Sequence, residues 1–179
     1  MPTNVEIKAR VHDWPRQCGL AEALADGPVE ILQQNDTFFE VARGRLKLRD
    51  LGGENGELIH YERPDRTGPK RSLYRVVPTD DPASLRAVLE LALGVLGRVR
   101  KTRRLYIRGQ TRIHLDTVAG LGRFLELEVM LNPGQSLAHG QRIAEELCDQ
   151  LEVRSADRVA GAYLDLILAS GGKLQAEEK

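Results

Sequence analysis

Asn4-Val5-Glu6-Ile7-Lys8-Ala9-Arg10 and Phe124-Leu125-Glu126-Leu127-Glu128-Val129 are two short stretches, near opposite ends of the chain, in which polar and apolar residues alternate. On a β-strand, residues two apart project from the same face. Both stretches therefore predict strands with polar, mostly charged side chains on one face and apolar side chains on the other. Taken alone, either stretch is typical of an ordinary strand with one face in water.

The same alternation recurs at 44–50, 57–63, 99–105 and 111–117. One face of the predicted sheet then gathers long cations and carboxylates: Glu6, Lys8, Arg10, Arg45, Lys47, Arg49, Arg63, Lys101, Arg103, Arg112, Asp116, Glu126 and Glu128. His114 shares this face, where we expect a neutral structural histidine. Like charges on neighbouring strands repel, so such a face is easier to understand if it surrounds an anionic ligand. Closing about eight strands into a barrel would place these side chains in a polar lumen.

The rest of the pattern predicts an α+β fold, in which about eight strands are mostly antiparallel neighbours. Helices are expected at 13–26, 81–94, 135–151 and 155–169, because apolar residues recur there at helical spacing. They would flank the barrel on its outside. No linker or repeat divides the chain, so we expect a single domain over residues 1–170 and a disordered tail over residues 171–179.

Composition narrows the class of protein. The chain has 179 residues, of which 41% are hydrophobic and 29% charged, as in an ordinary globular domain. A formal net charge of zero gives no indication of a nucleic-acid or membrane partner. No apolar run approaches the roughly 20 residues that span a bilayer, and the first residues lack a signal-peptide pattern. Cys18 and Cys148 form no metal-binding pair. We therefore expect a cytoplasmic protein, and a homodimer stays open.

Cations and carboxylates on one face indicate a particular kind of ligand. Lys and Arg bind phosphates. Carboxylates among them become useful when they hold a hard divalent ion such as Mg²⁺, which also bridges phosphates. Both together are typical of phosphoryl or nucleotidyl transfer on a triphosphate. The alternative is an ordinary sheet that presents a charged face to water.

Several motifs, in order along the chain, resemble the CYTH superfamily of triphosphate tunnel metalloenzymes. Asn4-x-Glu6-x-Lys8 resembles the N-terminal Glu-x-Glu-x-Lys signature. Further stretches resemble later segments of the family, in order: residues 34–39, 44–49, 58–63, 99–103, 114–116, 120–122 and 124–129. Ala162-Tyr163-Leu164-Asp165-Leu166 is similar to the ending of the class IV adenylyl cyclase branch.

The resemblance implies a closed eight-stranded antiparallel β-barrel, a tunnel that binds a nucleotide or another triphosphate with Mg²⁺ or Mn²⁺. The implied metal ligands are Glu6, Asp116, Glu126 and Glu128. The implied triphosphate-binding residues are Lys8, Arg45, Lys47, Arg49, Arg63, Lys101 and Arg103. Lys8 and Asp116 are the residues expected to act in catalysis.

Asn4 departs from the family signature, which has a glutamate at this position. An amide oxygen can coordinate a hard metal, but it brings no charge, so one metal position would be weakened. Three functions therefore stay open. The first is a class IV adenylyl cyclase that converts ATP to cyclic AMP and pyrophosphate, which the C-terminal resemblance favours. The second is an inorganic or organic triphosphatase, for example one acting on thiamine triphosphate. The third is a non-catalytic binder of polyphosphate or nucleotide.

Overall fold

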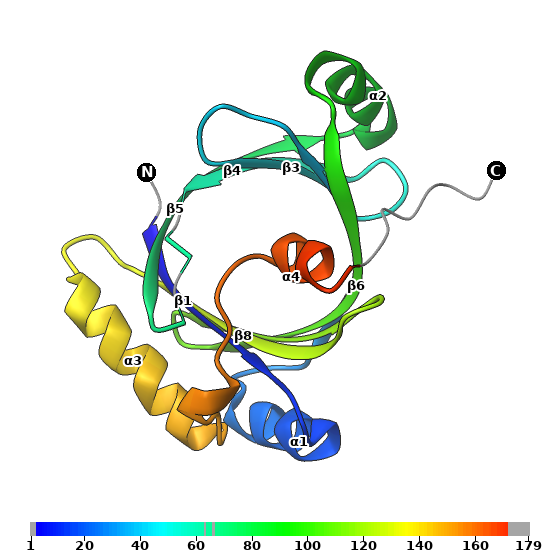
Figure 1. The fold of residues 1–179 in the computed structure, drawn as a ribbon. Coiled ribbons are helices and arrows are strands. Elements are labelled where there is room, and N and C mark those ends of the chain that lie inside the picture. The colour runs from blue at the N-terminus through cyan, green and yellow to red at the C-terminus, as the bar shows by residue number, and fades with distance from the viewer. Residues whose placement is uncertain (1–2, 63, 66, 172–179) are drawn as a thin grey trace.

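Eight antiparallel strands close into a barrel in the computed structural model, which describes residues 3–62, 64–65 and 67–171 (Figure 1). Around the barrel the strand order is β1-β5-β4-β3-β2-β6-β7-β8. The strands are β1 (Thr3–Arg10), β2 (Glu30–Phe39), β3 (Arg45–Asp50), β4 (Gly56–Glu62), β5 (Lys70–Thr79), β6 (Val95–Arg108), β7 (Thr111–Val118) and β8 (Gly122–Met130). The helices are α1 (Trp14–Leu24), α2 (Pro82–Leu93), α3 (Leu137–Gln150) and α4 (Tyr163–Ala169), with a 3-10 turn at Ser155–Asp157. The predicted closed eight-stranded barrel is confirmed.

The N-terminal strand closes the barrel, because β1 pairs with β8 on one side and with β5 on the other. In this register Glu6 lies opposite Glu128, and Lys8 lies opposite Glu126. The two alternating stretches at opposite ends of the chain are therefore neighbours in space. Their charged side chains face the same lumen.

An outer apolar core lies between the barrel wall and two helices. Ile7 of β1, Leu115 of β7 and Leu127 of β8 point outwards and are fully buried. Helix α3 packs against β1 and β8, and residues of α1 and α3 such as Ala21 and Leu147 belong to the same cluster. Burial of these apolar side chains stabilises the wall, while their polar neighbours in sequence are directed into the lumen.

A second apolar cluster lies inside the barrel, at one end of the lumen. Its strand residues share a face with the charged lumen residues, as Phe124 does with Glu126 and Glu128. The cluster comprises Phe38, Ile59, Tyr61, Val99, Val118, Phe124, Tyr163 and Leu164. Figure 1 looks down the barrel and shows α4 across its middle, whereas α1, α2 and α3 lie outside. Helix α4 and the inner cluster together cover one end of the lumen.

The prediction of a single helix over 155–169 is wrong. After the 3-10 turn at Ser155–Asp157, the chain runs along β1: Arg158 forms an isolated β-bridge with Ala9, and the Val159 amide donates to the Lys8 carbonyl at 2.9 Å. Gly161 then takes a φ of +80°, a conformation that favours glycine. These tertiary hydrogen bonds outweigh the local helical pattern, and they deliver Tyr163 to the end of the lumen.

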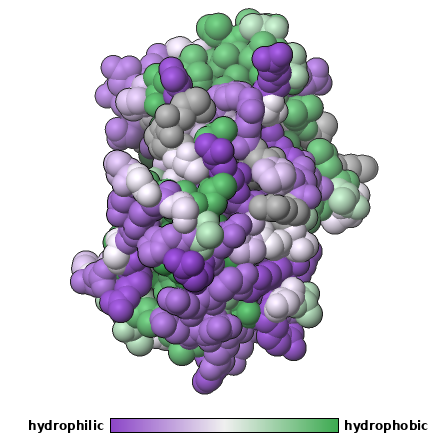
Figure 2. Space-filling model, turned by 90° about the vertical axis from the view of Figure 1, so that its left-hand side faces the viewer, coloured by the Kyte–Doolittle hydropathy of each residue, from purple (hydrophilic) through white to green (hydrophobic). Residues whose placement is uncertain are grey.

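Hydrophilic side chains dominate the face of the molecule shown in Figure 2, and hydrophobic side chains gather at its top, the level at which α2 lies in Figure 1. There α2 exposes Val88 and Leu91. Within the described ranges, no helix is long and apolar enough to cross a membrane.

Candidate functional site

The lumen holds a cavity of about 680 Å³ whose lining includes residues from all eight strands. This volume is in the range of pockets that bind small molecules, roughly 300–1,000 Å³. The sequence-predicted residues that line it are Glu6, Lys8, Lys47, Arg49, Lys101, Arg103, Glu126 and Glu128. Arg112 and His114 also line it. Arg45 and Asp116 do not belong to its lining, and Arg63 lies outside the described residues.

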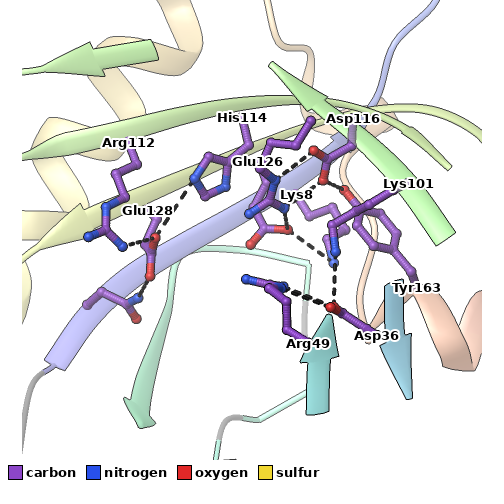
Figure 3. Close-up of polar contacts among 12 residues, drawn as sticks. Lys8, Asp36, Arg49, Lys101, Arg112, His114, Asp116, Glu126, Glu128 and Tyr163 are labelled. Carbon is purple, nitrogen blue, oxygen red and sulfur yellow. Dashed lines mark hydrogen bonds and ion pairs between the residues drawn. The ribbon is translucent and has the colours of Figure 1, made fainter. Parts of the chain in front are cut away.

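Asp36 of β2 is the centre of a cation cluster that the sequence-based prediction missed. Its Oδ2 accepts hydrogen bonds from Lys47 Nζ and Lys101 Nζ, both at 3.0 Å, and from Arg49 at 2.9 Å. Its Oδ1 accepts from Arg49 Nε at 2.8 Å. Figure 3 shows Arg49 and Lys101 approaching this carboxylate. The signal was present in the sequence, because Asp36 alternates with Gln34 and Phe38 and therefore faces the lumen.

Burial and charge act against each other in this cluster. Burial would raise the pKa of Asp36, but Arg49, Lys101 and Lys47 together hold it well below the usual value. Burial lowers the pKa of Lys101 to about 7 and that of Lys47 to about 8, although Asp36 opposes the shift in both. Two of the cluster's cations are therefore able to lose their proton near neutral pH.

A second buried carboxylate, Asp116 of β7, holds Arg103 of β6. Arg103 donates two hydrogen bonds of 2.7 Å, one to each Asp116 oxygen, and the Tyr163 hydroxyl donates a third of 2.8 Å. Burial would raise the pKa of Asp116, but Arg103 lowers it overall. Burial also raises the pKa of Tyr163 well above the usual value, which keeps the hydroxyl protonated.

In this arrangement both Asp116 oxygens accept hydrogen bonds, and Asp116 acts on the cavity through Arg103. The C-terminal Tyr163 closes this part of the site, since Lys8 Nζ lies 3.9 Å from the centre of its ring. Asp116 does not belong to the cavity lining, and its role as a metal ligand or catalytic carboxylate stays a prediction.

The remaining carboxylates gather on β1 and β8. Burial raises the pKa of Glu128, and the neighbouring Glu6 and Glu126 raise it further, while Arg112 lowers it. Asn4 Nδ2 donates to Glu128 Oε1 at 2.5 Å, and Arg112 lies 3.4 Å from the other oxygen. Lys8 Nζ lies 3.4 Å from Glu126. Figure 3 shows Glu126 and Glu128, with Lys8 and Arg112, beside the cation cluster.

The chemistry of this carboxylate group fits a hard divalent cation. Glu6, Glu126 and Glu128 offer oxygen donors whose mutual repulsion a cation would relieve, and the buried Asn4 Oδ1 has no hydrogen-bond partner. Among the described residues, however, no three Asp, Glu, His or Cys side chains already stand in a metal-holding group. Mg²⁺ commonly keeps waters and binds through one or two carboxylates plus substrate phosphates. The residues therefore suit a metal whose shell is completed by ligand and water.

Arg45 lies apart from the cation cluster and outside the cavity lining, so its predicted role in triphosphate binding stays a prediction. Its NH2 group lies 2.8 Å from Asp65 and also 2.8 Å from Asp165 of α4. Residue 45 alternates correctly with Lys47 and Arg49, but it stands at the first position of β3, opposite Tyr61 of the inner apolar cluster. Its contacts attach α4 to the barrel rather than line the cavity.

His114 is buried in the cavity wall, with its Nε2 4.0 Å from Glu128. Burial, reinforced by the charge of Arg103, lowers the pKa of His114 well below the usual value. The imidazole is therefore neutral near pH 7, in agreement with the expectation of an uncharged histidine.

The class of this protein is a closed antiparallel barrel whose inner wall carries both cations and carboxylates. The CYTH domain family matches residues 2–163, and the chain belongs to this family. No curated protein matches the chain.

Solved structures share the barrel. A Pyrococcus horikoshii protein is 24% identical, with a TM-score of 0.77, over 91% of this chain and 98% of its own. An adenylate cyclase candidate from Vibrio parahaemolyticus is 21% identical, with a TM-score of 0.75, over 93% and 97%. An adenylyl cyclase candidate from Hippeastrum, described as having a dominant triphosphatase activity, is 18% identical, with a TM-score of 0.65, over 97% and 100%. At these identities the likeness establishes the fold.

Proposed function

We propose that this protein is a divalent-metal-dependent enzyme that binds a linear triphosphate in its tunnel. The observation that carries the proposal is the lining of one cavity by two groups of opposite charge. The cationic group comprises Lys8, Lys47, Arg49, Lys101 and Arg103, and the acidic group comprises Glu6, Glu126 and Glu128. Cations alone would suffice to hold phosphate. The carboxylates repel phosphate unless a metal lies between them.

The cations would bind the phosphate chain and neutralise the charge that develops on it during the reaction. Arg103 is pre-oriented by Asp116, so its fixed guanidinium would meet phosphate oxygens with little loss of conformational freedom. Glu6, Glu126 and Glu128 would hold Mg²⁺ or Mn²⁺. Such an ion supplies Lewis-acid activation of a phosphoryl oxygen.

The first candidate reaction is that of a class IV adenylyl cyclase. The ribose 3′-hydroxyl of ATP would attack the α-phosphate, and pyrophosphate would leave. The cavity supports an organic triphosphate, because apolar Leu32, Val76, Leu105 and Ile107 also line it. These residues offer a surface for a base or another organic group.

The second candidate is a triphosphatase, in which water attacks the terminal phosphate. The Hippeastrum relative, whose description pairs a cyclase candidate with a dominant triphosphatase activity, supports this alternative. Asn4 supports a third candidate, a polyphosphate or nucleotide binder without turnover. It places an uncharged amide beside Glu128, at a position where a carboxylate side chain would strengthen a metal site.

Product analysis tests these candidates. The purified protein is incubated with ATP, thiamine triphosphate or inorganic triphosphate, each with Mg²⁺ or Mn²⁺. Cyclic AMP with pyrophosphate identifies a cyclase, and orthophosphate identifies a triphosphatase. Thermal unfolding is followed with tripolyphosphate in parallel, since a ligand at 100 times its Kd stabilises a protein by about 2.7 kcal/mol. Binding without turnover would leave only the binder, and an unchanged melting temperature would overturn triphosphate binding altogether.

A further inference from the structure

Lys47, Arg49 and Lys101 come from two strands, yet they meet at one carboxylate. Lys47 and Arg49 belong to β3 and Lys101 to β6, and β2, which carries Asp36, lies between these strands in the barrel. Asp36 is 1% exposed and lies within 3.0 Å of a nitrogen of each cation. The carboxylate is almost completely buried, and the three cations surround it.

The charge balance explains why Asp36 is needed. Three cations close together, one buried and two partly buried, would repel one another, and each has lost part of its hydration. One carboxylate that all three contact offsets this repulsion and restricts their side chains. Without it, the flexible lysines would be expected to turn away from each other before any ligand arrived.

Asp36 leaves each cation with donors for a ligand. An ammonium group has further N–H donors when one is engaged, and a guanidinium held through Nε and one NH2 hydrogen keeps its other edge. Lys47, Arg49 and Lys101 all line the cavity together with Asp36. The carboxylate therefore fixes the cations from behind while their remaining N–H groups are available to phosphate oxygens.

We propose that Asp36 is a positioning residue of the triphosphate site, which acts through Lys47, Arg49 and Lys101 and not by contact with metal or the reacting atoms. This inference rests on the proposed function, because it assigns the cluster to phosphate binding. It contrasts with simple charge masking, in which Asp36 would occupy the place of a phosphate and compete with it.

The two alternatives predict opposite signs for one substitution. Loss of a negative charge from the lumen strengthens anion binding if Asp36 only masks the cations. If Asp36 positions them, Asp36→Asn weakens binding, because the cations are no longer held together. We expect the Kd for tripolyphosphate to rise about tenfold or more, since small displacements of positioning groups have large effects.

Glu57→Gln is the matched control. Glu57 lines the same cavity and loses the same charge. It lies opposite Arg49 in the β3–β4 register and acts on it through charge, whereas Asp36 also holds Arg49 by hydrogen bonds. Glu57→Gln should leave the Kd unchanged or lower it slightly. Calorimetric titration with tripolyphosphate in metal-free buffer compares the wild-type protein, Asp36→Asn and Glu57→Gln, so metal binding does not enter the result.

The energetic coupling between Asp36 and the two lysines gives a second test, because a merely structural role of Asp36 would not produce such coupling. In a protein that carries Lys47→Met and Lys101→Met, the added effect of Asp36→Asn on Kd should shrink to a few-fold at most. Equal effects in both backgrounds would mean that Asp36 does not act through these lysines. Equal or tighter binding by Asp36→Asn alone would likewise overturn the inference.

A spectroscopic measurement on the wild-type protein covers the case in which Asp36→Asn does not fold. With lysine labelled by ¹³C at Cε and the signals of Lys47 and Lys101 assigned by their Lys→Met variants, positioning predicts that both signals are immobilised before tripolyphosphate is added. Signals that become ordered only with ligand would contradict it. If wild-type protein binds no tripolyphosphate either with or without Mg²⁺, the proposed function fails. If it binds tripolyphosphate but Asp36→Asn does not weaken binding, only the role of Asp36 fails.

Discussion

Asp36 and Glu128 are largely buried carboxylates in the wall of the same cavity, yet their pKa values shift in opposite directions. Three cations hold the pKa of Asp36 well below its usual range. Burial raises the pKa of Glu128, and two neighbouring glutamates add to the shift. The cationic region is therefore balanced within the protein, with Asp36 and Asp116 as its counter-ions. The acidic region around Glu128 is not balanced to the same extent, which is the electrostatic condition of a site that gains from a bound cation.

The largest effect should come from the balanced region. Asp116→Asn leaves the buried Arg103 guanidinium without the carboxylate that accepts hydrogen bonds from its Nε and from one NH2 group. We expect the free energy of unfolding to fall by about 3–5 kcal/mol, the usual cost of breaking a buried ion pair. Chemical denaturation measures the change.

The surface pair between Arg16 and Glu152 provides the control, because both side chains are about half exposed, 57% and 48%. Glu152→Gln should lower the free energy of unfolding far less, because exposed ion pairs contribute little to stability. If both substitutions lower the free energy of unfolding equally, Asp116 is not the buried counter-ion of Arg103, and the cationic region is not balanced within the protein.

In the acidic region, the joint substitution Glu126→Gln and Glu128→Gln should act on metal-dependent turnover. Amides keep the shape of the site but remove its charge, so we expect the rate to fall by at least about a hundredfold, as for lost ligand interactions at metal sites. Turnover is measured with Mg²⁺ and with Mn²⁺, and binding of tripolyphosphate without metal should persist. Unchanged rates would remove these residues from the proposed metal site.

Asn4→Glu sharpens the comparison by adding charge to the acidic region. It replaces the amide that donates to Glu128 with a third like charge beside Glu6 and Glu128. The metal-free protein should become less stable, while Mn²⁺ affinity and turnover should rise about tenfold, a change worth about 1.4 kcal/mol. Calorimetry with Mn²⁺ and thermal unfolding without metal measure the two effects, and a drop in both stability and affinity would contradict the metal assignment.

The smallest effect is a pH dependence of the balanced region. The pKa of Lys101 is about 7 and that of Lys47 about 8, so both lose charge as the pH rises through these values. Affinity for tripolyphosphate should fall a few-fold per unit between about pH 7 and 9, as titration calorimetry can show. Bound phosphate resists the change because it raises both pKa values.

Stability of the ligand-free protein should change in the opposite direction. An unfolded lysine has a pKa of about 10.4, so between about pH 7 and 10 the unfolded chain binds more protons than the folded one. The contribution of these lysines to stability therefore rises with pH. Denaturation of wild-type protein and Lys101→Met over this range tests the sign: the variant should show the smaller slope.

Much of the barrel could be predicted because alternation along a strand depends on neighbouring residues alone. The pattern in Glu6 and Lys8 and in Glu126 and Glu128 assigns each side chain to a face without any knowledge of the partner strand. The charges gathered on one face suggested a barrel closed around a ligand, and the family resemblance implied the same closure. The same local reasoning failed for 155–169, since the hydrogen bond from Val159 to Lys8 belongs to a strand about 150 residues away in the sequence.

Within the site, alternation also has limits. It places Arg45 on the same face as Lys47 and Arg49, but it does not say how far along the barrel axis each one lies. It gives Asp36 and Asp116 as lumen carboxylates without distinguishing a metal ligand from a counter-ion. That distinction depends on which cations the neighbouring strands bring within hydrogen-bonding distance.

The sequence by itself determined which side chains face inwards, because a period of two follows from the geometry of a single strand. Only the tertiary structure decided which charges meet. Barrel closure sets the register between strands, and it brings Lys101 of β6 and Arg49 of β3 to Asp36 of β2 between them. It also brings Tyr163 from the end of the chain to Asp116. Because electrostatic interactions in a buried site depend on distances of a few ångströms, the roles of these carboxylates follow from the assembled barrel.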